Sequence, residues 1–190
     1  MRTFIAIELD GRILDHIDAI RDRLRAVGGD VKWVQRVNTH LTIKFIGETA
    51  PELVAGIAAA LGEAAAESDA FDIEVCGVGT FPPRRPAVLW VGVRAEPGGP
   101  LARLHEAIES RLQKLGIAKE NRRFSPHITL GRVRGGRHVR KLLAALENEQ
   151  PADMGRSPVA SVILFESKLT PEGPVYNRLA EAPLHQRSGH

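Results

Sequence analysis

The sequence predicts an α+β protein of mostly antiparallel strands, with helices on the outer faces and two similar lobes. Each half of the chain shows alternating apolar and polar segments interrupted by two helical segments. No linker between the halves is long or polar enough to separate independent domains. We therefore expect a single bilobal domain over residues 1–190, with a lobe boundary near 96–100 and segments that exchange between the lobes.

In the first half, the apolar residues between two strand-like segments recur at helical spacing, and this helix ends at Gly28 and Gly29. An alanine-rich helix follows from Pro51 to about Glu67, with Thr49 as its expected N-cap. The PPRRP segment at 82–86 predicts a loop. The expected strands are 4–9, 31–34, 40–47, 71–81 and 87–94.

The second half opens with an amphipathic helix over 100–115, which stops at Gly116. A short basic helix is expected over 137–148. The expected strands are 124–133, 158–169 and 174–184, the last two joined by a turn at TPEGP.

Positive charge is concentrated in one stretch. Residues 119–141 hold eight Lys or Arg and one acid, Glu120, so their net charge is +7, whereas the whole chain carries only +3. Such a region attracts phosphates, including nucleic acid backbones, although a solvated arginine-rich surface has the same composition.

Other features limit the class of protein. With Cys76 as the single cysteine, no intrachain disulfide and no thiolate metal site is possible. The apolar run at the N-terminus is too short for a signal peptide, and no stretch approaches transmembrane length. We expect a cytoplasmic protein.

The pattern His, aliphatic, Thr, aliphatic occurs twice, as HLTI at 40–43 and HITL at 127–130. Both copies lie in expected strands, where alternation places the histidine and the threonine on one face. One copy alone is weak evidence, but two copies 87 residues apart favour a duplicated site.

Two imidazoles facing one phosphodiester can divide the proton transfers, because histidine titrates near neutrality. One takes a proton from the nucleophile and the other gives a proton to the leaving oxygen. The neighbouring threonine hydroxyls can hold the phosphate oxygens. This chemistry requires no metal or cofactor, and the sequence lacks HExxH, GxSxG and P-loop motifs.

The two motifs in their contexts, HLTIKFIGE and PHITLGRV, resemble those of the 2H phosphoesterases. The segments TFIAIEL, GVGTFPPRRPAVLWVGV and ESKLTPEGPVY extend the resemblance over about 2–179, to the RNA 2',3'-cyclic phosphodiesterases, which were first named 2'-5' RNA ligases.

The resemblance implies a bilobal fold with a pseudo-twofold axis and a cleft between two antiparallel sheets. It implies hydrolysis of an RNA terminal 2',3'-cyclic phosphate to a 2'-phosphate, with reversible 2'-5' ligation as associated chemistry. Its proton donor to the 3'-oxygen would be His40, and the base that activates water would be His127. Thr42 and Thr129 would bind the phosphate. The expected partners are RNA ends or nucleotides with a cyclic phosphate; no membrane or protein partner is implied, and a monomer is expected.

Arg132 is a further candidate for phosphate binding. Strict alternation puts it on the face opposite His127, unless a bulge at Gly131 re-aims it. By the same parity Lys44 shares the face of His40, with an exposed lysine as the alternative, and Phe45 is expected in the core.

Two other functions stay open on the sequence. The chain could act on a different cyclic phosphate or on a 2'-5' oligonucleotide, or it could bind RNA ends without turnover. The retention of both histidines favours catalysis, since binding alone does not require a pair of proton-transfer groups.

Overall fold

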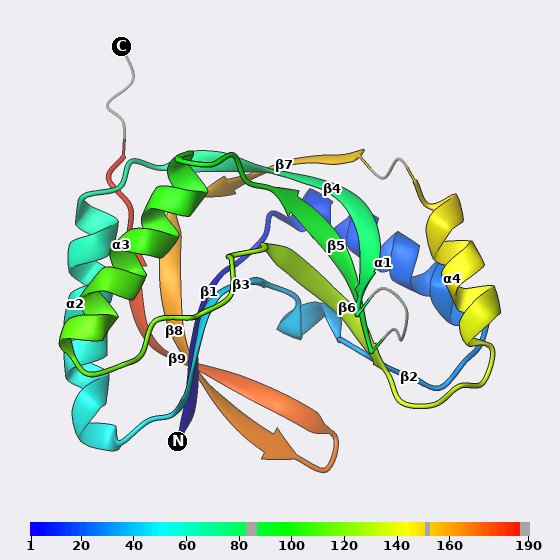
Figure 1. Ribbon diagram of the computed structural model, residues 1–190, viewed down its shortest axis with the longest axis horizontal. Helices are drawn as coiled ribbons and strands as arrows, with labels where there is room; N and C mark the ends of the chain where they lie inside the picture. Colours follow the sequence, from blue (N-terminus) through cyan, green and yellow to red (C-terminus); the bar gives the residue numbers. More distant parts are fainter. Residues whose placement is uncertain (83–86, 151–152, 187–190) are drawn as a thin grey trace.

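The computed structural model describes residues 1–82, 87–150 and 153–186, so most of the expected PPRRP loop lies outside the described residues. Four helices and nine strands follow one another along the described parts of the chain (Figure 1). They are β1 (Arg2–Ile7), α1 (Gly11–Ala26), β2 (Val31–Trp33), β3 (Leu41–Glu48), α2 (Val54–Ala66), β4 (Phe71–Phe81), β5 (Val88–Arg94), α3 (Pro100–Lys114), β6 (His127–Val133), α4 (Val139–Asn148), β7 (Asp153–Val159), β8 (Ser161–Thr170) and β9 (Gly173–Pro183).

The strands form one curled sheet in the order β7-β4-β5-β6-β3-β1-β8-β9, with β2 paired to β6. All the pairs between these strands are antiparallel, as the sequence predicts. The two expected sheets are joined into one by the pairing of Leu41 with Ile128, which links β3 to β6. Each half of the sheet takes strands from both sides of residues 96–100, so the chain crosses between the halves more than once.

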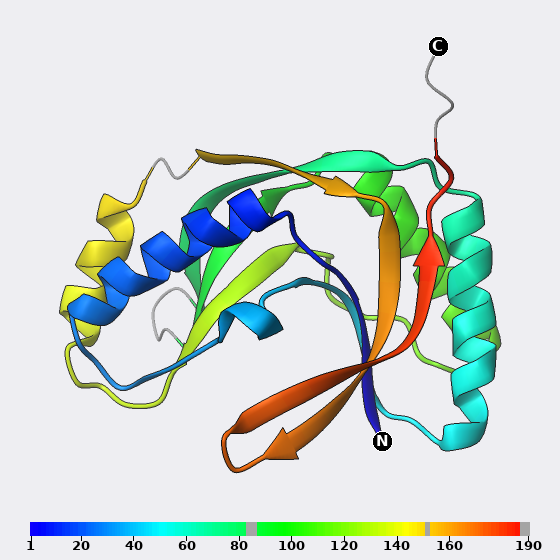
Figure 2. The same cartoon turned by 180° about the vertical axis from the view of Figure 1, so that it is seen from behind.

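The helices cover the two halves separately (Figures 1 and 2). Helix α2 packs on β8, β9 and α3, while α1 packs on β7 and α4 lies against β4. One continuous apolar core joins all four helices to the sheet, because the strand residues that face them are aliphatic. No helix in the described part of the chain has the length and apolar character needed to cross a membrane.

A small aromatic cluster lies apart from this core. Phe4 and Phe165 are buried together with two aliphatic neighbours, and Tyr176 packs against them. These residues come from β1, β8 and β9, which are adjacent in the sheet. The cluster therefore gives one half of the sheet an apolar floor on the face away from the main core.

Two local expectations are wrong. The Thr49 hydroxyl hydrogen-bonds Thr3 and the carbonyl of Gly47 and caps no helix, because the next helix opens with a 3-10 turn at Pro51–Leu53. The expected strand 158–169 starts too early: it is β8 from Ser161 on, and its first two residues end β7, a strand that the sequence does not predict. Apolar residues continue on both sides of Ala160 and Ser161, so the sequence does not mark the break between the two strands.

Candidate active site

The pairing of β3 with β6 brings the two His-x-Thr motifs together. Leu41 and Ile128, the residues between each histidine and threonine, are directly paired and fully buried. The two strands run antiparallel at this pair. The histidine end of each motif therefore lies beside the threonine end of the other: His40 toward Thr129, and Thr42 toward His127.

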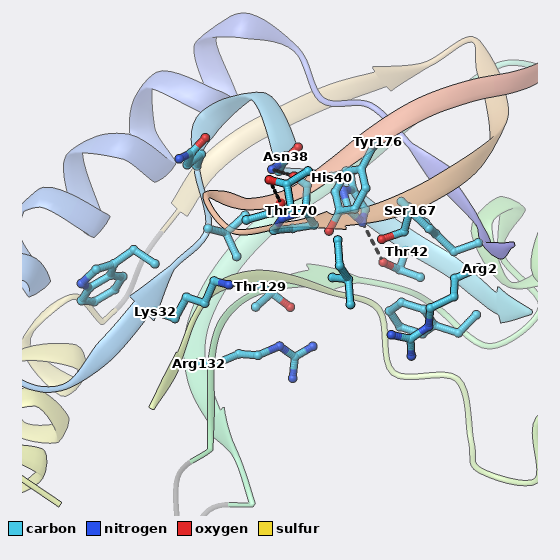
Figure 3. Close-up of a pocket in the computed structure, with 18 of the residues that line it drawn as sticks. Arg2, Lys32, Asn38, His40, Thr42, Thr129, Arg132, Ser167, Thr170 and Tyr176 are labelled. Atoms are coloured by element: carbon cyan, nitrogen blue, oxygen red, sulfur yellow. Dashed lines mark hydrogen bonds between the residues drawn. The ribbon is translucent and has the colours of Figure 1, made fainter. Parts of the chain in front are cut away.

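A cavity of about 570 Å³ opens over this pairing. His40, Thr42 and Thr129 line it, together with Arg132 and Tyr176 (Figure 3). His127 is not among its lining residues. The predicted phosphate ligands therefore share one cavity with the first histidine, and the register places the second histidine beside it.

His40 lies on the aromatic floor of this cavity. Its ring stacks on Phe4 at 5.0 Å and meets the edge of Tyr176 at 5.4 Å. Burial lowers the pKa of His40 to about 4, although a hydrogen bond to the backbone of Asn38 opposes this shift. His40 is therefore neutral at pH 7 in the free protein. Its Nε2 lies 3.0 Å from the hydroxyl oxygen of Thr42, within hydrogen-bond distance.

His127 has different surroundings. Its Nδ1 lies 2.8 Å from the carbonyl oxygen of Ser125, and its ring meets Phe81 at 5.1 Å with an interplanar angle of 80°. A carbonyl oxygen can only accept, so Nδ1 carries a proton. In the neutral ring Nε2 is then the free acceptor, which is the state that a general base requires.

Each motif is followed by a bulge, and both bulges lie one residue after the threonine. In β3, Ala6 pairs with Thr42 and Ile5 with Lys44, so Ile43 has no partner across the strands. In β6, the corresponding unpaired residue is Leu130, because Trp90 pairs with Thr129 and Leu89 with Gly131. Such an extra residue reverses the faces of the residues that follow it.

The bulge in β6 decides the position of Arg132. Alternation would turn this side chain away from the site, but Arg132 lines the cavity with Thr129. Its charge also acts across the cavity: burial raises the pKa of Tyr176, and Arg132 opposes that rise. The sequence placed the possible bulge at Gly131, one residue from the unpaired Leu130.

The bulge in β3 has the matching effect, and the expectations for Lys44 and Phe45 are wrong. Phe45 is 65% exposed and lines the cavity, at the position that corresponds to Arg132. Lys44 is turned into the protein, where its Nζ lies 2.8 Å from a carboxylate oxygen of Glu109 and donates to the carbonyl of Ala118. Lys44 is therefore neither a residue of the cavity nor an exposed lysine.

The basic stretch at 119–141 divides into two groups at opposite ends of β6. Arg122 and Arg123 precede the strand, while Lys119 is paired with Glu106. The other exposed cations follow the strand: Arg134, Arg137, Arg140 and Lys141. Only the strand itself, through Arg132, brings this charge into the cavity.

Several lining residues were not singled out in the sequence. Tyr176 is the chain's one tyrosine, and Lys32 and Arg2 are ordinary strand cations. Their presence depends on which strands are neighbours in the sheet, and no local pattern carries that information. Among the described residues, no three His, Cys, Asp or Glu side chains form a group that could hold a metal ion.

A family model described as the 2'-5' RNA ligase superfamily matches residues 10–165. A protein of Aeropyrum pernix named RNA 2',3'-cyclic phosphodiesterase is 37% identical over 85% of this chain and 91% of its own. One of the same name from Methanothermobacter thermautotrophicus is 34% identical over 93% and 95%.

Solved structures also match. The crystal structure of TT0787 of Thermus thermophilus has a TM-score of 0.83 at 28% identity, covering 98% of this chain and 100% of that chain. E. coli LigT complexed with 3'-AMP has a TM-score of 0.78 at 25% identity, covering 96% and 97%.

Proposed function

This chain belongs to the 2'-5' RNA ligase superfamily, and we propose that it hydrolyses RNA 2',3'-cyclic phosphate ends by proton transfer between His40 and His127. The relatives named RNA 2',3'-cyclic phosphodiesterase support the reaction. The observation that supports the two-histidine mechanism is the pairing of Leu41 with Ile128, because it brings the two motifs side by side on adjacent strands in antiparallel order.

In the proposed reaction, water attacks the phosphorus of the cyclic phosphate. Nε2 of His127 takes a proton from the water as the new oxygen–phosphorus bond forms. The bond between phosphorus and the 3'-oxygen breaks, and His40 gives its proton to that oxygen. The products are a 3'-hydroxyl and a 2'-phosphate. A 5'-hydroxyl that attacks in place of water would form a 2'-5' linkage with the same two histidine roles. In the reverse step, the 3'-hydroxyl attacks that linkage, the cyclic phosphate re-forms, the 5'-oxygen leaves, and the two histidines exchange roles.

His40 must carry a proton to act as the acid, yet burial keeps it neutral in the free protein. The substrate would raise the pKa of His40, because a cyclic phosphate brings a negative charge into the cavity and an adjacent anion favours the protonated imidazole. We therefore expect substrate and proton to bind together. The donor and acceptor roles themselves come from the resemblance to the family.

The hydroxyls of Thr42 and Thr129 are the proposed ligands of the non-bridging oxygens, and they approach the phosphate from the two halves of the sheet. Arg132 supports them as a cation at the same cavity. Charge that develops on phosphate oxygens in the transition state is stabilised most by donors that are already in place. The proposal describes a metal-independent monomer that acts on RNA ends in the cytoplasm.

The test is an RNA with a 2',3'-cyclic phosphate end, incubated with the protein with and without a chelator, followed by identification of the phosphomonoester. We expect the 2'-phosphate and no effect of the chelator. A 3'-phosphate product would overturn the assignment of the leaving oxygen. Loss of activity with chelator would overturn the metal-independent mechanism, and tight binding without turnover would make the chain an RNA-end binding module.

A further inference from the structure

Two cations lie directly opposite each other at the edge of the cavity. Lys32 of β2 and Arg132 of β6 are paired in register, and both side chains are exposed and line the cavity. Like charges placed directly opposite on adjacent strands destabilise a sheet. The repulsion between these two side chains therefore lowers the stability of the free protein, and a bound anion would reduce that repulsion.

The surrounding charges do not offset the repulsion between Lys32 and Arg132. Within the described residues, neither Lys32 nor Arg132 has a carboxylate within 4 Å, whereas Arg2, the third cation of the cavity, lies 3.6 Å from Glu48. Glu172 is the acidic lining residue; it lies in the turn between β8 and β9, where it accepts a hydrogen bond from Thr170. Lys32 and Arg132 thus form a positively charged edge of the cavity, and neither is in an ion pair among the described residues.

This charged edge lies beyond the position proposed for the reacting phosphate. Arg132 follows Thr129 by three residues, at most about 10 Å along a strand, and the intervening bulge keeps both on the cavity side. Figure 3 shows Lys32 and Arg132 reaching into the cavity from this end, while His40 and Thr42 lie across it. The reacting cyclic phosphate carries one negative charge, and His40 takes a proton to meet it. With Arg132 also at that phosphate, Lys32 is a further cation that the single charge does not require.

We propose that Lys32, beside Arg132, binds the phosphate that joins the terminal nucleotide of the RNA to its neighbour. This inference rests on the proposed function, and it makes the site selective for a polynucleotide end over a free cyclic nucleotide. From this second phosphate the RNA would continue past the end of β6, where Arg134 is the next exposed cation. Lysine suits this position, because its ammonium serves as a flexible point charge for phosphate.

The experiment compares three substrates that end in a 2',3'-cyclic phosphate: a mononucleotide, a dinucleotide, and the same dinucleotide with an uncharged methylphosphonate linkage. Steady-state kcat/KM is measured for the wild type and for Lys32→Ala. We expect the wild type to prefer the charged dinucleotide, and Lys32→Ala to lose about five- to tenfold on it, mostly through KM. The losses on the other two substrates should be several-fold smaller.

Salt gives a second readout. The plot of log kcat/KM against log salt should become shallower by about 0.7 in Lys32→Ala with the charged dinucleotide, which corresponds to one phosphate contact on a single strand. Lys32→Arg should keep the preference. The matched control is Arg103→Ala, an exposed arginine on α3 that does not line the cavity, and it should change neither the preference nor the salt dependence.

Equal losses on all three substrates would overturn the inference, because Lys32 would then act on the reacting phosphate. No loss in Lys32→Ala, or equal wild-type activity on the charged and the methylphosphonate dinucleotides, would also overturn it. Binding of dinucleotide and mononucleotide 2'-phosphates decides the same question without turnover: Lys32→Ala should weaken only the dinucleotide. A wild type that shows this binding but hydrolyses no cyclic phosphate would refute the proposed function and leave the second phosphate site standing.

Discussion

The two halves of the sheet carry the same motif with the same bulge, but they give the two histidines different surroundings. His40 lies on a floor of aromatic rings with its Nε2 next to Thr42. His127 is held through Nδ1 by the carbonyl of Ser125, so that Nε2 is the acceptor of its neutral ring. The duplication therefore accounts for what the two motifs share, and the neighbouring residues give each histidine a different environment.

The residues after the motifs show the same contrast. Phe45 and Arg132 occupy corresponding places in the cavity. The residues just before them, Lys44 and Gly131, also correspond in the two strands but do not line the cavity. One half of the site is thus aromatic and anchored by a buried ion pair, and the other is cationic. Substitutions at corresponding positions measure how far the two halves differ.

The largest effect is expected from the histidines. His40→Ala and His127→Ala should each lower kcat by about 10²- to 10⁴-fold, the usual contribution of a general acid or base. The measurement is single-turnover hydrolysis of an RNA with a 2',3'-cyclic phosphate end, with circular dichroism as the control for folding. Near wild-type activity in either folded variant would contradict the two-histidine mechanism.

Lys44 tests the anchor of the first half. Its side chain and that of Glu109 are 5% and 3% exposed, so removing one partner leaves a buried charge unpaired. We expect Lys44→Met to lower the free energy of unfolding by about 3–5 kcal/mol. The double variant Lys44→Met with Glu109→Leu should recover much of this loss. Urea denaturation measures both.

The matched control for this pair is Lys168→Met, which removes an exposed lysine 3.3 Å from Glu166. It should change stability by no more than about 0.5 kcal/mol. A loss at Lys44 as small as that at Lys168 would contradict the anchoring role.

Arg132 and Phe45 form the next comparison. Arg132→Ala should lower kcat/KM by about tenfold or more, since hydrogen bonds to charged groups contribute roughly 1.5–3 kcal/mol. Phe45→Ala should cost less, because most of its ring is already exposed and no charge is lost. Kinetics on one RNA substrate compare the two. A larger loss for Phe45→Ala would reverse the proposed assignment of the cationic half to phosphate binding.

The threonines give a smaller difference. Thr42→Val removes a proposed phosphate ligand and the hydroxyl that bonds His40, whereas Thr129→Val removes only the former. We expect losses in kcat/KM of about tenfold for each, with the larger loss at Thr42. The pH profile of kcat/KM should move only in Thr42→Val. Identical profiles in both variants would show that the bond to His40 has no effect.

Much of this site could be predicted from the sequence, because a repeated His-x-Thr pattern on strands identifies both catalytic candidates. The alternation also places Leu41 and Ile128 in the core correctly. The bulges could not be predicted, since Ile43 and Leu130 are ordinary aliphatic strand residues whose lack of a partner depends on neighbouring strands. The bulge at Ile43 explains why the expectations for Lys44 and Phe45 are wrong.

The protonation of His40 is the central difference between the halves, and NMR titration of its ring nitrogens tests it most directly. In the free protein the pKa should be near 4, so the ring is neutral above that pH and gains its proton only as the pH falls through it. With a nucleoside 2'-phosphate bound, the account predicts that the pKa of His40 rises by about two units or more, because the imidazolium is then paired with an anion. A pKa that stays near 4 in the complex would contradict the account, since His40 could not then donate a proton at neutral pH.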